Sequence, residues 1–188
     1  MTTKEYQDNL YISLRSKLSE LEIKNEWIAF PESTKHYSPR VDIAIGPFSI
    51  YQQNIDEYDR LINQGNIRSF LRSLYDCHKD NIAIECQNEN HIEIPNFEEL
   101  LIKNRNARCL LAFEIENRNS RKHIMGSLIN AASLGRIGIG IAYSENTLKT
   151  FIRILKYLQF LKQVEKNTYD TTNFLIITKE QMVAILNN

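Results

Sequence analysis

The amino-acid sequence predicts an α/β protein, and three observations carry that prediction. The 188 residues include 43% hydrophobic and 24% charged residues, a composition typical of a folded globular chain. Strand patterns alternate with helical patterns along the second half of the chain, and such strand–helix–strand units pair their strands in parallel. Residues 1–188 show no internal repeat and no low-complexity linker, so we expect a single domain.

The first segments predict a helix followed by two strands. Residues 4–24 suit a helix because leucines recur on one face at spacings of three and four, at Leu10, Leu14, Leu18 and Leu21. Residues 27–30 form a short apolar run that suits an edge strand. Residues 41–45 alternate, which places Asp42 near the start of a strand, on the face opposite its aliphatic neighbours.

An insertion of about residues 52–106 separates these strands from the rest of the predicted sheet. Residues 54–80 predict one or two polar helices with an apolar packing face. Residues 81–96 are ambiguous and could form a hairpin, because isoleucines alternate with other side chains at Ile82, Ile84, Ile92 and Ile94. We therefore expect a largely helical insertion.

Residues 109–116 give the clearest strand pattern in the chain. The segment starts as a continuous apolar run, as a central buried strand does, and ends in Glu114 and Glu116. The elements predicted after it are helix 121–134, strand 137–142, helix 144–163, strand 174–177 and helix 179–186. We expect Tyr157 and Phe160 to lie in the core.

Charge and cysteine content exclude several classes of protein. Lysine plus arginine equals aspartate plus glutamate, at 23 each, which argues against a protein that holds nucleic acid by bulk charge alone. No apolar stretch approaches the roughly 20 residues of a membrane-spanning helix, and the first residues lack the apolar run of a signal peptide. We expect a cytoplasmic protein with no membrane partner. Three scattered cysteines argue against a disulfide framework.

Three carboxylates are the strongest candidates for chemistry. Glu114 and Glu116 are two residues apart on a strand, so their side chains share one face. If that strand neighbours the strand of Asp42, the three carboxylates could bind Mg²⁺, which takes a few protein oxygens plus water and phosphate. The alternative is that Glu114 and Glu116 reach solvent and pair with Arg118 and Arg121.

This arrangement resembles the PD-(D/E)xK nucleases, the restriction-endonuclease-like family. Pro39-Arg-Val-Asp42 stands where the family has its PD motif, and Glu114-Ile-Glu116 stands where it has (D/E)xK. Two residues separate Pro39 from Asp42, and Glu116 replaces the usual lysine, as in some restriction enzymes. The resemblance covers roughly residues 5–50 and 107–143. It implies an αβββαβ core with a mixed sheet flanked by helices.

The resemblance also implies a metal-dependent endodeoxyribonuclease. Asp42 and Glu114 would hold Mg²⁺, and Glu116 would orient the attacking water or hold a second ion. A glutamate on the first helix sometimes completes the metal shell in this family, and Glu22 is the candidate. His123 follows in the first turn of the next helix, where it either assists the reaction or is a surface histidine.

Basic residues after the carboxylates are candidates for contacts with DNA phosphates. Segment 100–136 carries seven basic residues against two acidic ones, and Arg118, Arg121 and Lys122 cluster beside His123. Two solvated, oppositely charged faces are the alternative interpretation of this charge pattern.

The sequence shows no recognisable element for base recognition, such as a helix-turn-helix or a zinc finger. In size and motif the chain resembles the small catalytic subunit of a heterodimeric type IIS restriction endonuclease. That resemblance implies double-stranded DNA and a larger DNA-recognising subunit as partners. Two alternatives stay open: a non-catalytic interaction protein on a degenerate nuclease fold, and a stand-alone repair or junction nuclease.

Overall fold

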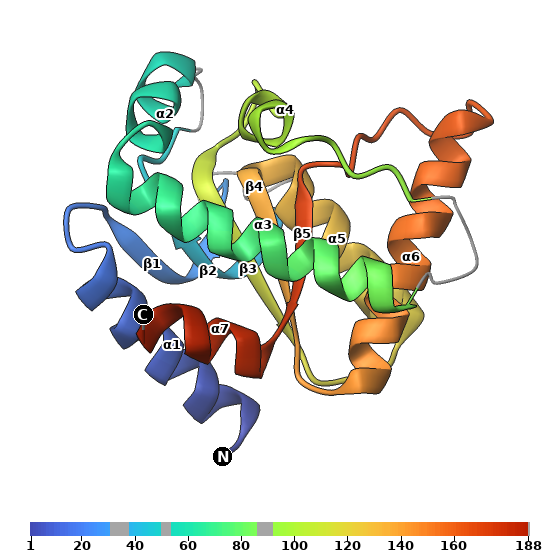
Figure 1. The fold of residues 1–188 in the computed structure, drawn as a ribbon, viewed down its shortest axis with the longest axis horizontal. Helices are drawn as coiled ribbons and strands as arrows, with labels where there is room; N and C mark the ends of the chain where they lie inside the picture. Colours follow the sequence, from blue (N-terminus) through green and yellow to red (C-terminus); the bar gives the residue numbers. More distant parts are fainter. Residues whose placement is uncertain (31–37, 50–53, 86–91, 188) are drawn as a thin grey trace.

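A mixed sheet lies at the centre of the protein (Figure 1). The structure is a computed structural model that describes residues 1–30, 38–49, 54–85 and 92–187. In these residues five strands follow the order β1-β2-β3-β4-β5: β1 (Ile23–Ile28), β2 (Arg40–Ile45), β3 (Cys109–Glu116), β4 (Gly135–Ala142) and β5 (Phe174–Thr178). Strands β1, β2 and β3 pair antiparallel, whereas β3, β4 and β5 pair parallel. The predicted α/β architecture with a mixed sheet is confirmed.

Helices cover both faces of this sheet (Figure 1). Those of the described residues are α1 (Thr3–Lys17), α2 (Ile55–Ile62), α3 (Gly65–Glu85), α4 (Phe97–Ile102), α5 (Arg121–Leu134), α6 (Glu145–Gln163) and α7 (Lys179–Asn187). Helices α1, α3 and α7 share one core with Phe113 and Ile139, and α5 and α6 share the other with Ala112 and Ile176. Within the described ranges, none of the helices has the length and apolarity needed to cross a membrane.

Helix α1 is shorter than the predicted helix 4–24. A capping box between Thr2 and Glu5 fixes its start, and the predicted leucines Leu10 and Leu14 are buried. The helix ends at Lys17 because Leu18 leaves helical geometry, with φ −121° and ψ 51°, while its side chain stays in the core. The chain then turns directly into β1, an edge strand that begins four residues before the predicted segment 27–30.

The insertion between β2 and β3 is helical where it is described. The hairpin predicted for residues 81–96 is wrong for residues 81–85, which complete α3. Ile82 is buried there and Ile84 is 63% exposed, so the isoleucine alternation belongs to opposite sides of one helix. Residues 86–91 lie outside the described residues. The short helix α4, with an Asn96–Glu99 capping box, was not predicted.

The β3–α5–β4 unit positions the candidate site. Strand β3 and helix α5 have the predicted bounds, and β4 begins two residues before the predicted segment 137–142. Glycine at position 138 lets α5 pack closely on β4, because a Cβ there would lie 2.8 Å from the carbonyl carbon of Ala131. This close packing fixes α5, which directly follows β3 in the chain, against the sheet.

Helix α6 differs from its prediction in one respect. Tyr157 and Phe160, expected in the core, are 49% and 54% exposed. The helix already buries a full apolar face through other residues, including Phe151 and Leu155, so these two rings fall on its solvent side.

Candidate active site

Asp42 reaches β3 across the end of the β2–β3 ladder. Ile43 pairs with Phe113, so continuing this antiparallel register places Asp42 opposite Glu114. The Asp42 Oδ2 atom accepts a hydrogen bond of 2.7 Å from the backbone N–H of Ile115. This bond fixes the Asp42 carboxylate beside β3, as the predicted site requires.

Glu114 and Glu116 lie on the face of β3 that α5 covers. Both residues are buried, at 6% and 3% exposure, so the alternative of solvated glutamates paired with nearby arginines does not hold. Glu116 Oε1 accepts a hydrogen bond of 2.6 Å from Ser127 Oγ and lies 3.5 Å from His123 Nε2. The α5 side chains therefore position one of the two carboxylates.

The Glu114 carboxylate stands without a partner. The residue is only 6% exposed, and among the described residues its carboxylate makes no hydrogen bond and no ion pair, although its oxygens still reach solvent. A buried charged group costs several kcal/mol unless it is paired or bound to a metal. Glu114 is thus the one member of the group that the protein itself leaves uncompensated.

The electrostatic environment disfavours negative charge at all three carboxylates. Burial, followed by the charges of Asp42 and Glu116, raises the pKa of Glu114 well above its usual value. Burial also raises the pKa of Asp42, against the Ile115 hydrogen bond, and the pKa of Glu116, against the Ser127 hydrogen bond. A cation at this position would relieve the mutual repulsion.

These carboxylates line a pocket of about 500 Å³, here called the carboxylate pocket. Its lining combines the three acids with basic and polar side chains: Ser38, Arg40, Asp42, Glu114, Ile115, Glu116, Lys122, His123, Gly126, Ser127 and Asn130. Glu114 and Glu116 are buried in it, whereas the His123 side chain is 62% exposed. Such a pocket offers cation ligands and contacts for an anion together.

The predicted site residues separate into those in the pocket and those outside it. Five of them line it: Asp42, Glu114, Glu116, Lys122 and His123. Arg118 is exposed and close enough to lower the pKa of Glu116, although burial outweighs it. Arg121 lines a different pocket, between α5 and α6.

Glu22 does not lie on the first helix, as was predicted for this candidate metal ligand, and it does not line the carboxylate pocket. The helix ends before it, and the Glu22 side chain is exposed, with an ion pair of 3.2 Å to Lys24. The neighbouring residue, Ile23, pairs with Ile45 at the end of β2 remote from Asp42.

Glu26 is an acidic residue near the site that sequence reasoning missed. The β1–β2 register places it opposite Asp42, and its φ of 52° interrupts the ladder there. Glu26 forms an ion pair of 3.1 Å with Arg40, and its charge raises the pKa values of Asp42 and Glu114. A lone acid inside a short strand is a weak sequence signal, because an edge strand often carries one.

The donor set fits Mg²⁺ held by two carboxylates rather than three. In the described ranges, no three histidine, cysteine, aspartate or glutamate side chains are arranged to hold a metal ion by themselves. The expected single coordination sphere of three carboxylates is therefore not met. Mg²⁺ is usually bound by one or two carboxylates, with waters and substrate phosphate as the other ligands. Glu114, lacking a partner, and Asp42, with only Oδ2 engaged, suit that arrangement.

Comparison with known proteins finds no matching family model, no matching curated protein and no matching solved structure. Functional interpretation therefore rests on the residues of the carboxylate pocket and their geometry.

Proposed function

We propose that the protein is a Mg²⁺-dependent endonuclease that hydrolyses a phosphodiester in one strand of double-stranded DNA. The observation that carries this proposal is the buried Glu114 carboxylate, which has no partner in the described chain and lies in one pocket with Asp42. Basic side chains line the same pocket, which suits an anionic substrate that shares the metal.

The order of elements also supports a nuclease. Along the chain there follow a helix, two antiparallel strands, a strand ending in carboxylates, a helix and a parallel strand. This is the order that the resemblance to restriction endonucleases implies. The site differs from the usual family pattern at Glu116, where lysine is typical. A carboxylate at this position can accept a proton but cannot supply the lysine's positive charge.

Each side chain has a definite role in the proposed reaction. Asp42 and Glu114 hold Mg²⁺, and the chemistry that this ion supplies is stabilisation of negative charge developing on the phosphate. Glu116, oriented by Ser127, accepts the proton of the attacking water. The water oxygen bonds to phosphorus as the bond to the leaving sugar oxygen breaks, and that oxygen takes a proton from solvent. Lys122 and Arg40 attract the phosphate.

A larger DNA-recognising subunit is part of this proposal. The chain carries no net charge, so the salt-dependent attraction to DNA must come from a few local cations. Phosphate contacts fix position on DNA but do not read sequence. A partner that binds the recognition site would raise the local concentration of this subunit at the bond it cuts.

Metal titration tests the catalytic proposal directly. In calorimetric titrations with Mn²⁺, we expect the full chain to bind the ion and both Asp42→Asn and Glu114→Gln to lose that binding. Glu22→Gln is the matched control, because it removes an exposed carboxylate outside the pocket. Equal binding by all four proteins would contradict the site, and absence of binding by the wild type would favour the non-catalytic alternative.

Cleavage mapping tests the role of a partner. In Mg²⁺ at near-physiological salt, we expect the isolated chain to show little or no sequence-specific cleavage and to gain it with a larger subunit. In the complex, the Asp42→Asn substitution should abolish cleavage of the DNA strand that this chain cuts. Double-strand cutting at a fixed site by the chain alone would instead indicate a stand-alone nuclease.

A further inference from the structure

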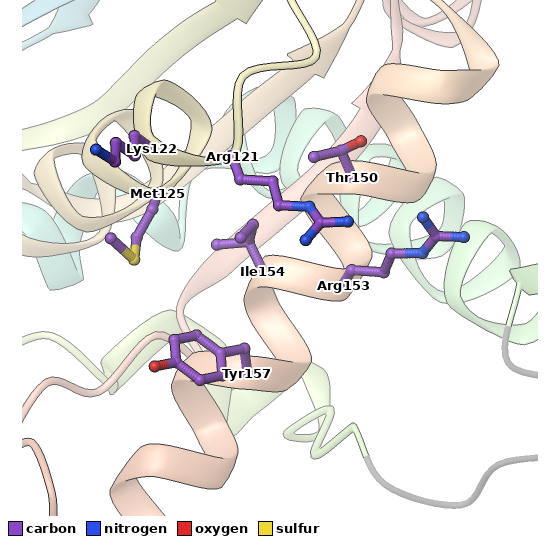
Figure 2. A pocket seen from close by; sticks show the side chains of 7 residues that line it. All are labelled: Arg121, Lys122, Met125, Thr150, Arg153, Ile154 and Tyr157. Carbon is purple, nitrogen blue, oxygen red and sulfur yellow. The ribbon is translucent and has the colours of Figure 1, made fainter.

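A second pocket, of about 440 Å³, lies between α5 and α6, and we call it the arginine pocket. It is lined by Arg121, Lys122, Met125, Thr150, Arg153, Ile154 and Tyr157. Figure 2 shows Arg121, Thr150 and Arg153 on one side, Lys122 beside Met125 on the other, and Tyr157 farther along α6. The surface inside the pocket is mostly apolar. We call the side with Arg121 and Arg153 its cationic end and the side with Tyr157 its apolar end.

The cationic end lacks an anion. Arg121 and Arg153 are exposed, and within the described parts of the chain neither makes a hydrogen bond or an ion pair. The residues lining the pocket include three cations and no carboxylate. Guanidinium groups bind phosphate strongly because their planar N–H donors match its oxygens. A phosphate group therefore complements this end of the pocket.

The apolar end offers a surface for a flat ring. The Tyr157 side chain is 49% exposed, while Ile154 is buried at 8% exposure and Met125 is half-buried. Nucleobases stack on exposed aromatic side chains in sites that bind single strands, with little dependence on base identity. A nucleotide combines the two chemical features that the pocket separates, a phosphate and a flat apolar ring.

The arginine pocket continues from the carboxylate pocket around the start of α5. Lys122 lines both pockets, and in Figure 2 its ammonium group points away from the other labelled side chains. A DNA strand with one phosphate in the carboxylate pocket can therefore pass Lys122 and reach Arg121 without leaving the basic surface of the protein.

We propose that the arginine pocket binds one nucleotide of the cleaved strand, next to the phosphate that is cut. Its phosphate lies against Arg121 and Arg153, and its base is turned out of the duplex onto Tyr157. This inference rests on the proposed nuclease function and specifies where the substrate strand leaves the active site. It also gives a physical role to the exposed tyrosine on α6.

Fluorescence anisotropy with a labelled short oligonucleotide, in EDTA and at low salt, tests this proposal without catalysis. We expect Tyr157→Ala to weaken binding about fivefold or more, as for the loss of one stacked base. Arg153→Ala should also weaken binding and lower the slope of log affinity against log salt by about one phosphate contact. Arg105→Ala and Phe160→Ala are matched controls, since both residues are exposed and lie outside the lining of either pocket.

The outcomes separate this proposal from the nuclease function. If the wild type binds the oligonucleotide and Mn²⁺ but the pocket variants bind DNA like the controls, the nucleotide site is overturned and the nuclease proposal stands. If the pocket variants lose affinity for a partner subunit instead of the oligonucleotide, the pocket is a protein-docking site and the proposal is overturned. A wild type that binds Mn²⁺ but no oligonucleotide overturns the nucleotide site alone, whereas a wild type that binds no Mn²⁺ overturns the nuclease proposal.

Discussion

Replacement of Glu114 by glutamine tests two effects of the buried carboxylate separately: its effect on folding stability without metal, and its contribution to Mg²⁺ binding. Glutamine has nearly the shape of glutamate but carries no charge. The Glu114 carboxylate is 6% exposed and has no partner among the described residues. In protein without metal, its burial works against folding, so the variant should be more stable than the wild type.

The size of this effect follows from the environment of Glu114. Burial of an ion costs several kcal/mol, whereas burial of an amide that lacks hydrogen bonds costs about 1–3 kcal/mol. We therefore expect a gain of about 1–3 kcal/mol in the free energy of unfolding. At about 2–4 °C per kcal/mol for a chain of this size, the melting temperature should rise by about 2–12 °C.

Mg²⁺ should offset or reverse the difference in stability between the wild type and Glu114→Gln. An ion present at a hundred times its dissociation constant stabilises the protein that binds it by about 2.7 kcal/mol, or about 5–11 °C. The wild type should gain this amount from Mg²⁺, while Glu114→Gln should gain none. The exposed control Glu22→Gln should melt like the wild type, with and without the ion.

Thermal melting at pH 8, in EDTA and then in Mg²⁺, measures both effects through the fluorescence of the single tryptophan, Trp27. A Glu114→Gln variant that is clearly less stable than the wild type in EDTA would contradict the assignment of an uncompensated carboxylate. Equal stabilisation of both proteins by Mg²⁺ would show that the ion binds elsewhere.

Two further predictions concern the core. His78 is buried and accepts a hydrogen bond from Ile176 N, and burial lowers its pKa from 6.5 to about 4, so the unfolded chain takes up the proton first. Stability should therefore fall by about 3 kcal/mol as pH falls from 6.5 toward 4, and His78→Gln should reduce that loss in urea unfolding at pH 7 and pH 4.5. Gly140→Ala should cost about 1–3 kcal/mol in thermal melting, by overpacking. Its Cβ would lie 2.6 Å from the Phe174 ring, whereas Gly65→Ala, with nothing within 4 Å, should not destabilise; equal melting of the two variants would contradict the close packing.

Local pattern alone determined the β3–α5 unit. The continuous apolar run at 109–116 and the helix at 121–134 were predicted with the observed bounds, because burial on both faces and the turn residues between them leave one arrangement. The shared face of Glu114 and Glu116 follows from the two-residue period of a strand. Apolar periodicity did not determine where α1 ends, because Leu18 is buried equally well in the turn after it.

The sequence pattern also did not distinguish the surface residues of α6 from its core residues. Aromatic rings at helical spacing suggest a packing face, yet Tyr157 and Phe160 are exposed because the apolar residues of α6 exceed what the sheet and α5 can cover. Their exposure is a property of the whole helix layer, and the exposure of Tyr157 is part of the basis of the proposed nucleotide site.

What the sequence determined by itself is which residue types lie on β2, β3 and α5 and which faces they share. Only the tertiary structure decided that Asp42 reaches the backbone of β3, that Glu26 rather than Glu22 approaches the site, and that Lys122 lines both pockets whereas Arg121 lines only the arginine pocket. The physical reason is that periodicity acts over a few residues, whereas strand order and register, which join segments up to 70 residues apart, depend on burying both cores at once.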